Sequence, residues 1–453
     1  MTRVLIPSGA LGLGYDPTAL ERGLAAKPDI IAIDGGSTDS GPSYLGRGVS
    51  KYSRASTKAE WRGLIEAREK TGVPLVIGTA GTCGAGSAVD WLVGITEEIL
   101  SELGLSAKVA VLKSDQPNKR VAEALTSGRI SPLYPAPEIS ADLIAECSNI
   151  VALAGAEQIA TAIETGADII IAGRTTDTAI IAALPLMRGD KAGAAWHGAK
   201  IGECGALCTT NPQTGVILVD FDAEGFTITP MAEDSHATPH TVSAHMLYEN
   251  SDPFILFEPG GHLDVTASAY AALDERQVRV TGSEWVPSDR YTVKLEGARR
   301  AGYQSVLLTL LRDRHYVENA DAWCADIQQK CRAKAMDRLG LSAEDFDLEL
   351  RIIGRNATLG PLENRANGAV ELGVAGIVTA ASPERVEEIA KMLNPYLLHH
   401  SLTAEEAMPT FAFPFSPAEV ERGEIFEFCL NHVMELNDPM EAFDLKVMNL
   451  PHA

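Results

Sequence analysis

The sequence is poor in basic residues. Its 453 residues include 38 lysines and arginines against 61 aspartates and glutamates, which gives a formal net charge of -23. A surface of that sign repels a phosphate backbone, so nucleic acid is not an expected partner. A small anionic ligand is still compatible with this charge, because backbone N–H groups and one or two arginines reverse the potential inside a pocket.

Long apolar runs are also missing. The apolar run at residues 4–6 is too short for the core of a signal peptide, and no later stretch reaches the roughly 18 unbroken apolar residues of a membrane helix. We therefore expect a cytoplasmic protein that does not enter a membrane.

Organised cysteines and nucleotide motifs are absent as well. The seven cysteines are odd in number and scattered, which argues against a disulfide framework, and the pair Cys204 and Cys208 has no second pair to complete a structural zinc site. The glycines at 9–14 read G-x-x-G-x-G instead of G-x-G-x-x-G, and no G-x4-G-K-[ST] occurs. Dependence on a nicotinamide cofactor or on ATP is not predicted.

What the sequence does contain is a regular alternation of apolar runs and amphipathic segments over its first 190 residues. The runs cover 3–7, 29–34, 74–79, 107–113, 149–154 and 168–173. Their continuous β-branched character is typical of strands buried on both faces, which predicts an α/β fold with a doubly wound parallel sheet.

After about residue 190 the pattern changes to alternating strands with fewer helices, which predicts an α+β domain. The chain is also longer than one hydrophobic core usually organises. We therefore expect two domains, an α/β ligand-binding domain at 1–195 and an α+β domain at 196–453 that completes the site.

Three turns that follow the apolar runs are rich in glycine and hydroxyl groups: GGSTDSG, GTCGAGS and GRTTDT. Ligands of open α/β sheets bind at the carboxyl ends of the strands, where such turns present N–H and O–H donors to an anion. The residues predicted to bind substrate there are Gly36, Ser37, Thr38, Ser40, Gly81, Thr82, Gly84, Arg174, Thr175 and Thr176.

Four side chains in these turns suit chemistry. Asp39 and Asp177 each follow a threonine just past a strand, where an aspartate either faces a ligand or caps the next helix. Arg174 is suited to hold a carboxylate or phosphate between its N–H groups. Cys83 is either a nucleophile activated by a helix N-terminus or a small residue that fits a glycine loop.

The second half of the chain offers two further candidate groups. Glu258 and His262 lie in FEPGGH, a glycine turn suited to general acid and base work or, alternatively, an exposed turn with polar tips. Arg355 and Asn356 in GRNATLG either clamp a second carboxylate or end a strand.

A metal site of two histidines and a carboxylate is a further interpretation. His236 and His240 have the spacing of two ligands on one helix, but Pro239 indicates that a helix only begins there. No metal ligands are assigned, and a divalent metal is left open.

Four stretches in order, IAIDGGSTDSGPSYLG, GADIIIAGRTTDTA, HGAKIGECGALC and FEPGGHLDVTA, resemble the acyclic terpene utilisation AtuA-like family. The resemblance covers most of residues 1–380. It implies a catabolic role, because family members are encoded beside acyl-CoA carboxylase genes, and it implies a small companion subunit as partner. This sequence has Thr176 where the family often has a small residue before the aspartate. The family supplies no catalytic residues to transfer, so the candidates above rest on the residues alone.

The leading hypothesis is a catabolic lyase of the hydratase type that acts on a small carboxylate or its CoA thioester. Asp39, Asp177, Glu258 and His262 would move protons, and Arg174 would anchor the anion. Such chemistry needs no redox cofactor, and CoA would enter only as part of the substrate.

Two alternatives stay open. The first is a hydrolase or acyl-transfer enzyme that uses Cys83, and the second is a non-catalytic subunit of a carboxylase-type complex. An oligomer is expected in either case.

Overall fold

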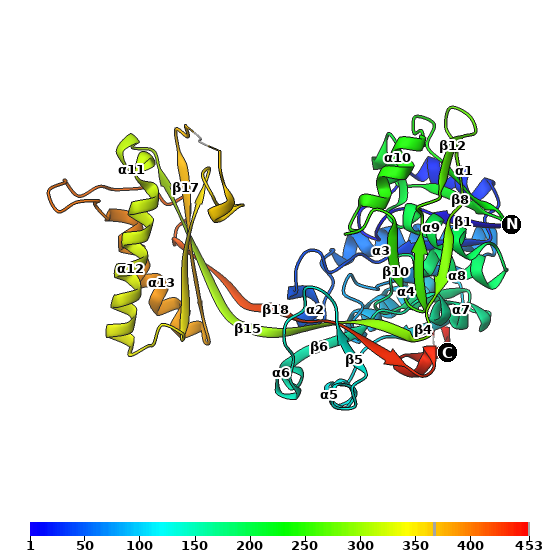
Figure 1. Ribbon diagram of the computed structural model, residues 1–453, viewed down its shortest axis with the longest axis horizontal. Helices are drawn as coiled ribbons and strands as arrows, with labels where there is room; N and C mark the ends of the chain where they lie inside the picture. The colour runs from blue at the N-terminus through cyan, green and yellow to red at the C-terminus, as the bar shows by residue number, and fades with distance from the viewer. Residues whose placement is uncertain (366–367, 452–453) are drawn as a thin grey trace. The chain divides into compact units, whose positions relative to one another are not determined.

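The computed structural model describes residues 1–365 and 368–451. The chain divides into two compact units (Figure 1). Unit 1 comprises Met1–Arg299 and the chain from Glu427 onward, and unit 2 comprises Arg300–Phe426. Strands β15 (Tyr291–Leu311) and β18 (Glu419–Leu436) contribute residues to both.

The core of unit 1 is a sheet whose five central strands are parallel. Their order is β1 (Thr2–Ile6), β2 (Ile30–Asp34), β3 (Leu75–Gly78), β7 (Ile169–Ala172) and β4 (Ala107–Lys113). Antiparallel strands extend both edges: β19 (Asp444–Leu450) pairs with β4, and on the β1 side follow β8 (Ile217–Phe221), β9 (Gly225–Pro230), β13 (Val278–Thr281) and β12 (Ala269–Ala272).

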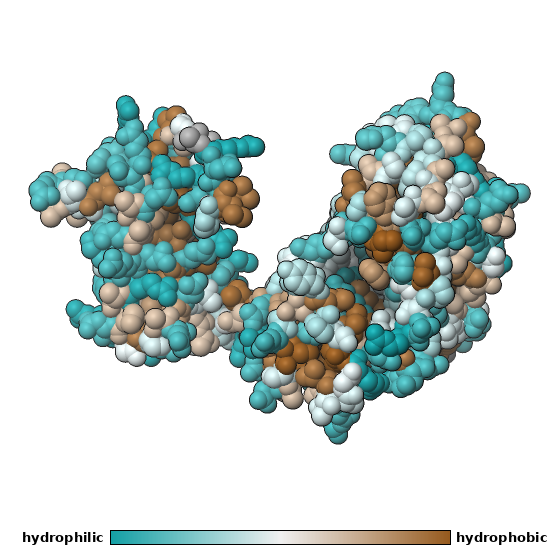
Figure 2. Space-filling view, viewed as in Figure 1, coloured by the Kyte–Doolittle hydropathy of each residue, from teal (hydrophilic) through white to brown (hydrophobic). Residues whose placement is uncertain are grey.

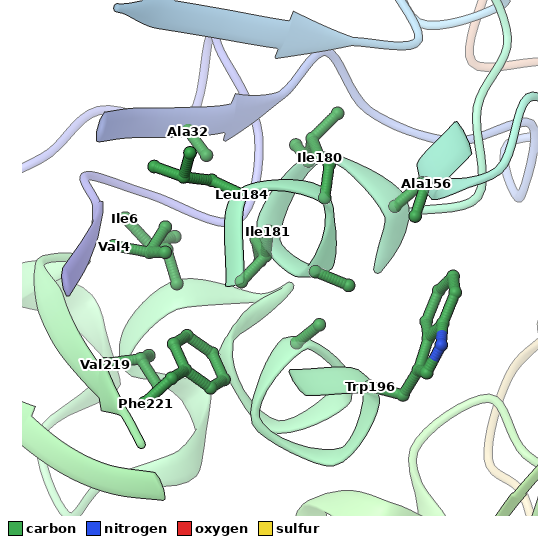
Figure 3. Close-up of a cluster of buried hydrophobic side chains, with 14 of the residues drawn as sticks. Val4, Ile6, Ala32, Ala156, Ile180, Ile181, Leu184, Trp196, Val219 and Phe221 are labelled. Atoms are coloured by element: carbon green, nitrogen blue, oxygen red, sulfur yellow. The ribbon is translucent and has the colours of Figure 1, made fainter. Parts of the chain in front are cut away.

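Helices cover both faces of this sheet. One face packs against α1 (Pro17–Ala25), α3 (Arg54–Thr71) and α4 (Gly86–Leu103), and the other against α7 (Ala156–Glu164), α8 (Ala179–Met187) and α9 (Ala192–Gly202). Successive side chains of a strand point to opposite faces, so Val4 and Ile6 contact the α8 and α9 side while Leu5 joins the other core (Figure 3). The predicted doubly wound α/β fold is confirmed.

One predicted strand lies elsewhere. The run at 149–154 forms β6 (Cys147–Ala152), which pairs antiparallel with β15 instead of joining the parallel sheet. In the parallel sheet, β7 lies between β3 and β4, and β6 has no place among these strands. The prediction of six parallel strands is corrected to five.

The division between the units differs from the boundary predicted near residue 195. Strands β8, β9, β12 and β13 follow that residue, yet they hydrogen-bond onto the edge of the parallel sheet and so belong to unit 1. The compact units part at Arg299/Arg300 and at Phe426/Glu427 instead.

Unit 2 has the predicted α+β character. In its sheet, β16 (Phe346–Ile353), β17 (Leu372–Ala380), β15 and β18 lie in that order. Strand β17 alternates buried and half-buried residues, because α12 (Ala320–Leu339) and α13 (Pro383–His399) cover one face of the sheet (Figure 1).

The other elements are short. In unit 1 they are α2 (Ser43–Arg47), α5 (Asn118–Thr126), β5 (Ile130–Pro132), α6 (Ala141–Glu146), η1 (Gly205–Cys208), η2 (Pro212–Thr214), α10 (Pro239–Ala244), η3 (His245–Leu247), β10 (Ile255–Glu258), β11 (Gly261–Asp264), β14 (Glu284–Pro287) and η5 (Pro439–Ala442). In unit 2 they are α11 (Arg314–Glu318) and η4 (Gly360–Leu362). Strands β10, β11 and β14 form a separate small sheet.

The surface is mostly hydrophilic on the side that Figure 2 shows, with apolar side chains in smaller groups between the hydrophilic ones. Within residues 1–365 and 368–451, every helix is too short or too polar to span a bilayer.

Candidate active site

Unit 1 contains a cavity of about 610 Å³ at the carboxyl ends of β1 and β2. Its walls come from residues within 8–14, 34–39, 51–52, 203–215 and 248–249, together with Asp177 from the turn after β7. This is the edge at which open α/β sheets bind their ligands. Segments far apart in the sequence therefore meet in one site.

The cavity wall is acidic. Five carboxylate side chains line it, and Lys51 is the single lysine or arginine among the described lining residues; the carboxylates are Asp34, Asp39, Asp177, Glu203 and Glu249. Carboxylates that are crowded together and partly buried resist ionisation, so some of them hold protons near neutral pH.

Asp34 is the last residue of β2 and is buried. Its Oδ2 atom accepts a hydrogen bond of 2.9 Å from the backbone N–H of Gly36, and its buried Oδ1 atom has no hydrogen-bond partner in the described part of the chain. Burial raises the pKa of Asp34 well above its ordinary value, and the nearby Asp177 raises it further. Gly36 makes the turn at a φ of +113°, a backbone conformation that favours glycine.

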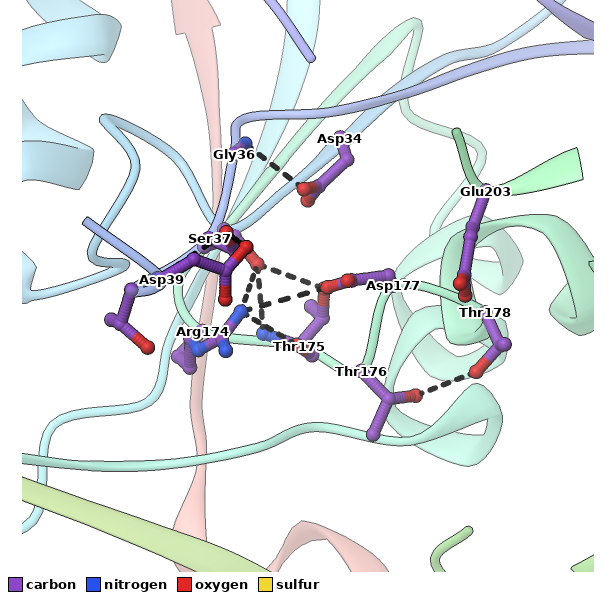
Figure 4. Close-up of polar contacts among 12 residues, drawn as sticks. Asp34, Gly36, Ser37, Asp39, Arg174, Thr175, Thr176, Asp177, Thr178 and Glu203 are labelled. Atoms are coloured by element: carbon purple, nitrogen blue, oxygen red, sulfur yellow. Dashed lines mark hydrogen bonds and ion pairs between the residues drawn. The ribbon is translucent and has the colours of Figure 1, made fainter. Parts of the chain in front are cut away.

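Asp177 lies next to a buried ion pair (Figure 4). Arg174 donates from Nε to Oε2 of Glu296 at 3.0 Å and from Nη2 to Oε1 at 3.2 Å, while its Nη1 atom lies 3.6 Å from Oδ1 of Asp177. Burial acts to raise the pKa of Glu296, but Arg174 outweighs it and lowers that pKa to about 2. For Asp177 burial is the larger effect, and the pKa is raised although Arg174 opposes it.

The contacts of Arg174 change the interpretation of that residue. The sequence suggested a guanidinium group open to a substrate anion. In the structure Glu296 occupies two of its N–H groups and Thr79 accepts a third hydrogen bond at 3.2 Å. Arg174 is not among the described residues that line the cavity, and its buried positive charge acts on the nearby carboxylate of Asp177.

Neither aspartate of the two similar turns caps a helix. The N-cap of α2 is Pro42 and that of α8 is Thr178, and neither residue forms a side-chain cap hydrogen bond. Asp39 and Asp177 both line the cavity instead, together with Gly36 and Ser37. The capping interpretation therefore does not apply to them, and their role in binding stays a prediction.

The other polar residues of the first turn, GGSTDSG, hold this turn in place through hydrogen bonds. Ser37 donates a hydrogen bond to Asp39, and Thr38 donates to Oε2 of Glu296 at 3.2 Å. Ser40 accepts a hydrogen bond of 3.1 Å from the ammonium group of Lys51. The turn is thus tied both to the buried ion pair and to the lysine of the cavity wall.

The second turn is a packing element. Gly81, Thr82 and Gly84 all have positive φ, and a Cβ atom on Gly84 would lie 2.2 Å from the backbone nitrogen of Arg174. Cys83 is fully buried, and burial raises the pKa of its thiol. The N-terminus of α4 is occupied as well, because Asp115 accepts a hydrogen bond from the N–H of Gly86. None of these features suits an activated thiolate.

Glu258 and the threonines of the third turn form a second polar cluster. Thr178 donates to Oε1 of Glu258 at 2.5 Å and lies 3.0 Å from the hydroxyl of Thr176. Burial raises the pKa of Glu258 to about 7, and the two threonines act against that increase. Thr175 is buried beside Thr79. The cluster adjoins Asp177 in the sequence but does not belong to the described cavity lining.

His262 and the candidates of the second half are not among the described residues that line the cavity. His262 is on β11, with its ring 5.5 Å from that of Phe257. Arg355 belongs to unit 2 and forms an ion pair with Asp321, and Asn356 lines a surface pocket of the same unit.

His236 and His240, which were considered as metal ligands, are also not among the described lining residues of the cavity. His236 hydrogen-bonds through Nδ1 to the carbonyl oxygen of Glu275, and His240 is exposed at the start of α10.

A cluster that the sequence did not predict lies beside the same cavity, and its members Glu203 and Cys204 line it. Lys200, on α9, donates a 2.5 Å hydrogen bond to Oε1 of Glu203, which is the C-cap of that helix. Burial raises the pKa of Glu203 to about 8 although Lys200 opposes the increase. Ligand atoms of Glu203, Cys204 and His245 lie within 4.8 Å of one another.

Sequence reasoning missed several of these side chains for identifiable reasons. Asp34 ends a buried strand, and an acid at that position is a signal that could have been used. Glu203 and Cys204 stand in the conspicuous stretch HGAKIGECGALC but follow no known spacing. Tyr248 and Glu249 lie in a loop without a motif, so only the fold shows that they reach the cavity.

The fold and the site define an α/β protein with an acidic cavity at the carboxyl edge of a parallel sheet. The profile of the acyclic terpene utilisation family protein AtuA matches residues 62–413, and the chain belongs to this family. Membership associates the chain with the catabolism of acyclic terpenes and specifies no reaction. No curated protein and no solved structure matches the chain.

Proposed function

We propose that the chain is a catabolic enzyme that removes or adds water next to the carbonyl of a small carboxylate or its CoA thioester. The observation that supports this proposal is the pair Asp34 and Asp177, which line one cavity; burial raises the pKa of both, and Asp177 raises that of Asp34 further. Two neighbouring carboxyl groups with different surroundings supply an acid and a base at the same pH.

The two aspartates have different surroundings, which suggests their roles. Asp177 lies beside Arg174, which favours its ionised form, so it would act as the base that takes a proton from the carbon next to the carbonyl. Asp34 has an unpaired buried oxygen, which favours the protonated form, so it would give a proton to the departing hydroxyl group. The C–H and C–O bonds break, a C=C bond forms, and water leaves.

Lys51 would take the anchoring role that the sequence assigned to Arg174. It lies on the cavity wall, and its ammonium group is bound only to the hydroxyl of Ser40 among the hydrogen bonds formed by the described side chains. An ammonium group in that position would attract the carboxylate of a free acid or a phosphate of CoA. The reaction requires no redox cofactor, and CoA would be part of the substrate.

The test uses a panel of small dicarboxylates and acyl-CoA esters. A ligand at about one hundred times its dissociation constant should stabilise the folded protein by roughly 2.7 kcal/mol, which thermal unfolding would show. Each ligand that binds is then incubated with the protein in D2O, and proton NMR follows exchange of the hydrogen next to its carbonyl.

We expect exchange with the wild type and its loss in Asp177→Asn, with retained ligand binding. Cys83→Ser serves as the control that should exchange normally. Binding without exchange in the wild type would contradict the proposed reaction, and exchange that persists in Asp177→Asn would contradict the role of that residue.

A further inference from the structure

Three side chains of types that bind metals lie close together beside the cavity, and two of them line it. The carboxylate of Glu203, the thiol of Cys204 and a ring nitrogen of His245 all lie within 4.8 Å of one another. Glu203 ends α9, Cys204 precedes η1, and His245 begins η3 after α10. Two of the three come from adjacent residues, and the third comes from a segment about forty positions further along the chain.

His245 provides the second, independent observation. Its side chain is only 5% exposed, and its Nε2 atom is buried without a hydrogen-bond partner in residues 1–365 and 368–451. A buried polar atom of this kind destabilises the fold unless something binds it. The ring is held in place by Tyr248, whose ring stacks on it at a centroid distance of 5.3 Å.

The surroundings of the other two ligands are also ordered. A Cβ atom on Gly9 would lie 3.0 Å from Cα of Cys204, so the loop after β1 packs tightly against this residue. Lys200 binds Oε1 of Glu203 and the carbonyl oxygen of Tyr248 at 2.8 Å. A carboxylate held in this way through one oxygen presents the other to a metal, as is common for metal ligands.

We propose that Glu203, Cys204 and His245 bind one zinc ion at the wall of the cavity. A thiolate, an imidazole and a carboxylate together are ligands that zinc accepts, whereas magnesium and calcium prefer oxygen alone. Ligand atoms around a tetrahedral zinc ion lie about 3.3–3.8 Å apart, as follows from metal–ligand distances of about 2.0–2.3 Å. Small side-chain rotations would bring the present arrangement to that size.

Three protein ligands leave the fourth position of a tetrahedral ion free, as in catalytic zinc sites. Glu203 and Cys204 both line the cavity, so the free position would be accessible from it. There the ion would bind a carbonyl or carboxylate oxygen of the substrate, a consequence that rests on the proposed function. The positive charge of the Lys200 ammonium group repels a zinc ion bound nearby. The carboxylates of Asp177 and Glu249, which line the same cavity, offset this repulsion.

The experiment measures metal binding by the untagged full-length chain without any substrate. The protein is freed of metal with a chelator and dialysed against zinc, and the bound zinc is counted by mass spectrometry. Cobalt(II) then replaces zinc as a spectroscopic probe, because a cobalt–thiolate bond produces a charge-transfer band in the near ultraviolet.

We expect one zinc per chain in the wild type and a thiolate band with cobalt. Changes to groups that only support a ligand weaken zinc binding by about 10–100-fold, so loss of a direct ligand in Cys204→Ser, His245→Gln or Glu203→Gln should weaken it by at least that much. The matched controls are Cys208→Ser, four residues from Cys204, and His240→Gln on the preceding helix, which should both bind zinc like the wild type.

Circular dichroism of each metal-free variant shows whether it folds, and the cobalt spectrum of the wild type decides the question even if one variant does not. The proposal is overturned if the metal-free wild type takes up no zinc, if the cobalt complex lacks the thiolate band, or if folded variants of the three ligands bind zinc as tightly as the controls. Because no substrate is present, zinc binding can succeed while the proposed reaction fails, and the reverse outcome is equally distinguishable.

Discussion

The guanidinium group of Arg174 forms two hydrogen bonds with the carboxylate of Glu296, which lies 122 residues further along the chain. Both side chains are only 7% exposed. The pair joins the turn after β7 to strand β15 and places a positive charge 3.6 Å from the carboxylate of Asp177. It therefore contributes to the fold of unit 1 and to the electrostatics of the cavity at the same time.

This pair should be sensitive to loss of one partner. Arg174→Met and Glu296→Gln each leave an uncompensated buried group, and we expect each to lower the free energy of unfolding by about 3–5 kcal/mol. The double variant should recover much of that loss, because both charges are then removed. Urea denaturation of the four proteins gives the coupling between the two residues.

The exposed pair Arg314 and Glu318 provides the control. Arg314→Met should cost less than about 1 kcal/mol, since water screens exposed ion pairs. A double variant in which the losses at Arg174 and Glu296 simply add would show that the two residues do not act as a pair.

The cavity aspartates should matter for activity more than for stability. We expect Asp177→Asn to reduce the rate of substrate proton exchange, and Asp34→Asn to reduce the rate of water elimination, each by about 10²–10⁴-fold, the usual contribution of a general base or acid. Their melting temperatures should stay within a few degrees of the wild type, because an amide replaces a carboxyl group of the same size. Asp337→Asn on the exposed surface of α12 is the control and should change none of these quantities.

Glu258 should make stability depend on pH. Its pKa is about 7 in the folded protein against an ordinary value of 4.5, so the folded state holds a proton that the unfolded chain has lost between these values. The stabilisation from this proton is complete below the lower value and disappears as the pH rises through about 7.

The measurement compares the wild type with Glu258→Gln by urea denaturation at about pH 5 and about pH 8, on either side of the shifted pKa. The stability of the wild type relative to this variant should fall by on the order of 2 kcal/mol across that interval. Exposed Glu138 is the matched control, and Glu138→Gln should show no such change. A constant difference between the wild type and Glu258→Gln would mean that Glu258 ionises normally.

Cys83 should be dispensable for chemistry. Its thiol is fully buried and its pKa is raised by burial, so a serine at this position removes no reactive group. We expect Cys83→Ser to keep the wild-type rate of exchange. Trapping of an acyl group on Cys83 during turnover, detected by peptide mass spectrometry, would instead support the hydrolase alternative.

Part of the fold follows from local patterns. The runs at 29–34 and 107–113 match β2 and β4 closely, because strands buried on both faces require continuous apolar residues. The same pattern wrongly predicted that the run at 149–154 joins the parallel sheet. The sequence of a buried strand has the same apolar character in every sheet, so it does not show that this strand pairs with β15. The pairing of β8 with β1 connects residues about two hundred positions apart, and no local signal marks it.

The amino-acid sequence by itself determined the acidic charge, the doubly wound sheet and the hydroxyl-rich turns at its carboxyl edge, because composition and periodicity act locally. Asp39 and Asp177 could be found in this way. Only the tertiary structure decided that Glu296 binds Arg174 and that Cys204 and His245 meet at the cavity wall. These contacts depend on how the chain after residue 195 folds back onto the sheet, and each is a pairing of distant residues that either partner alone does not reveal.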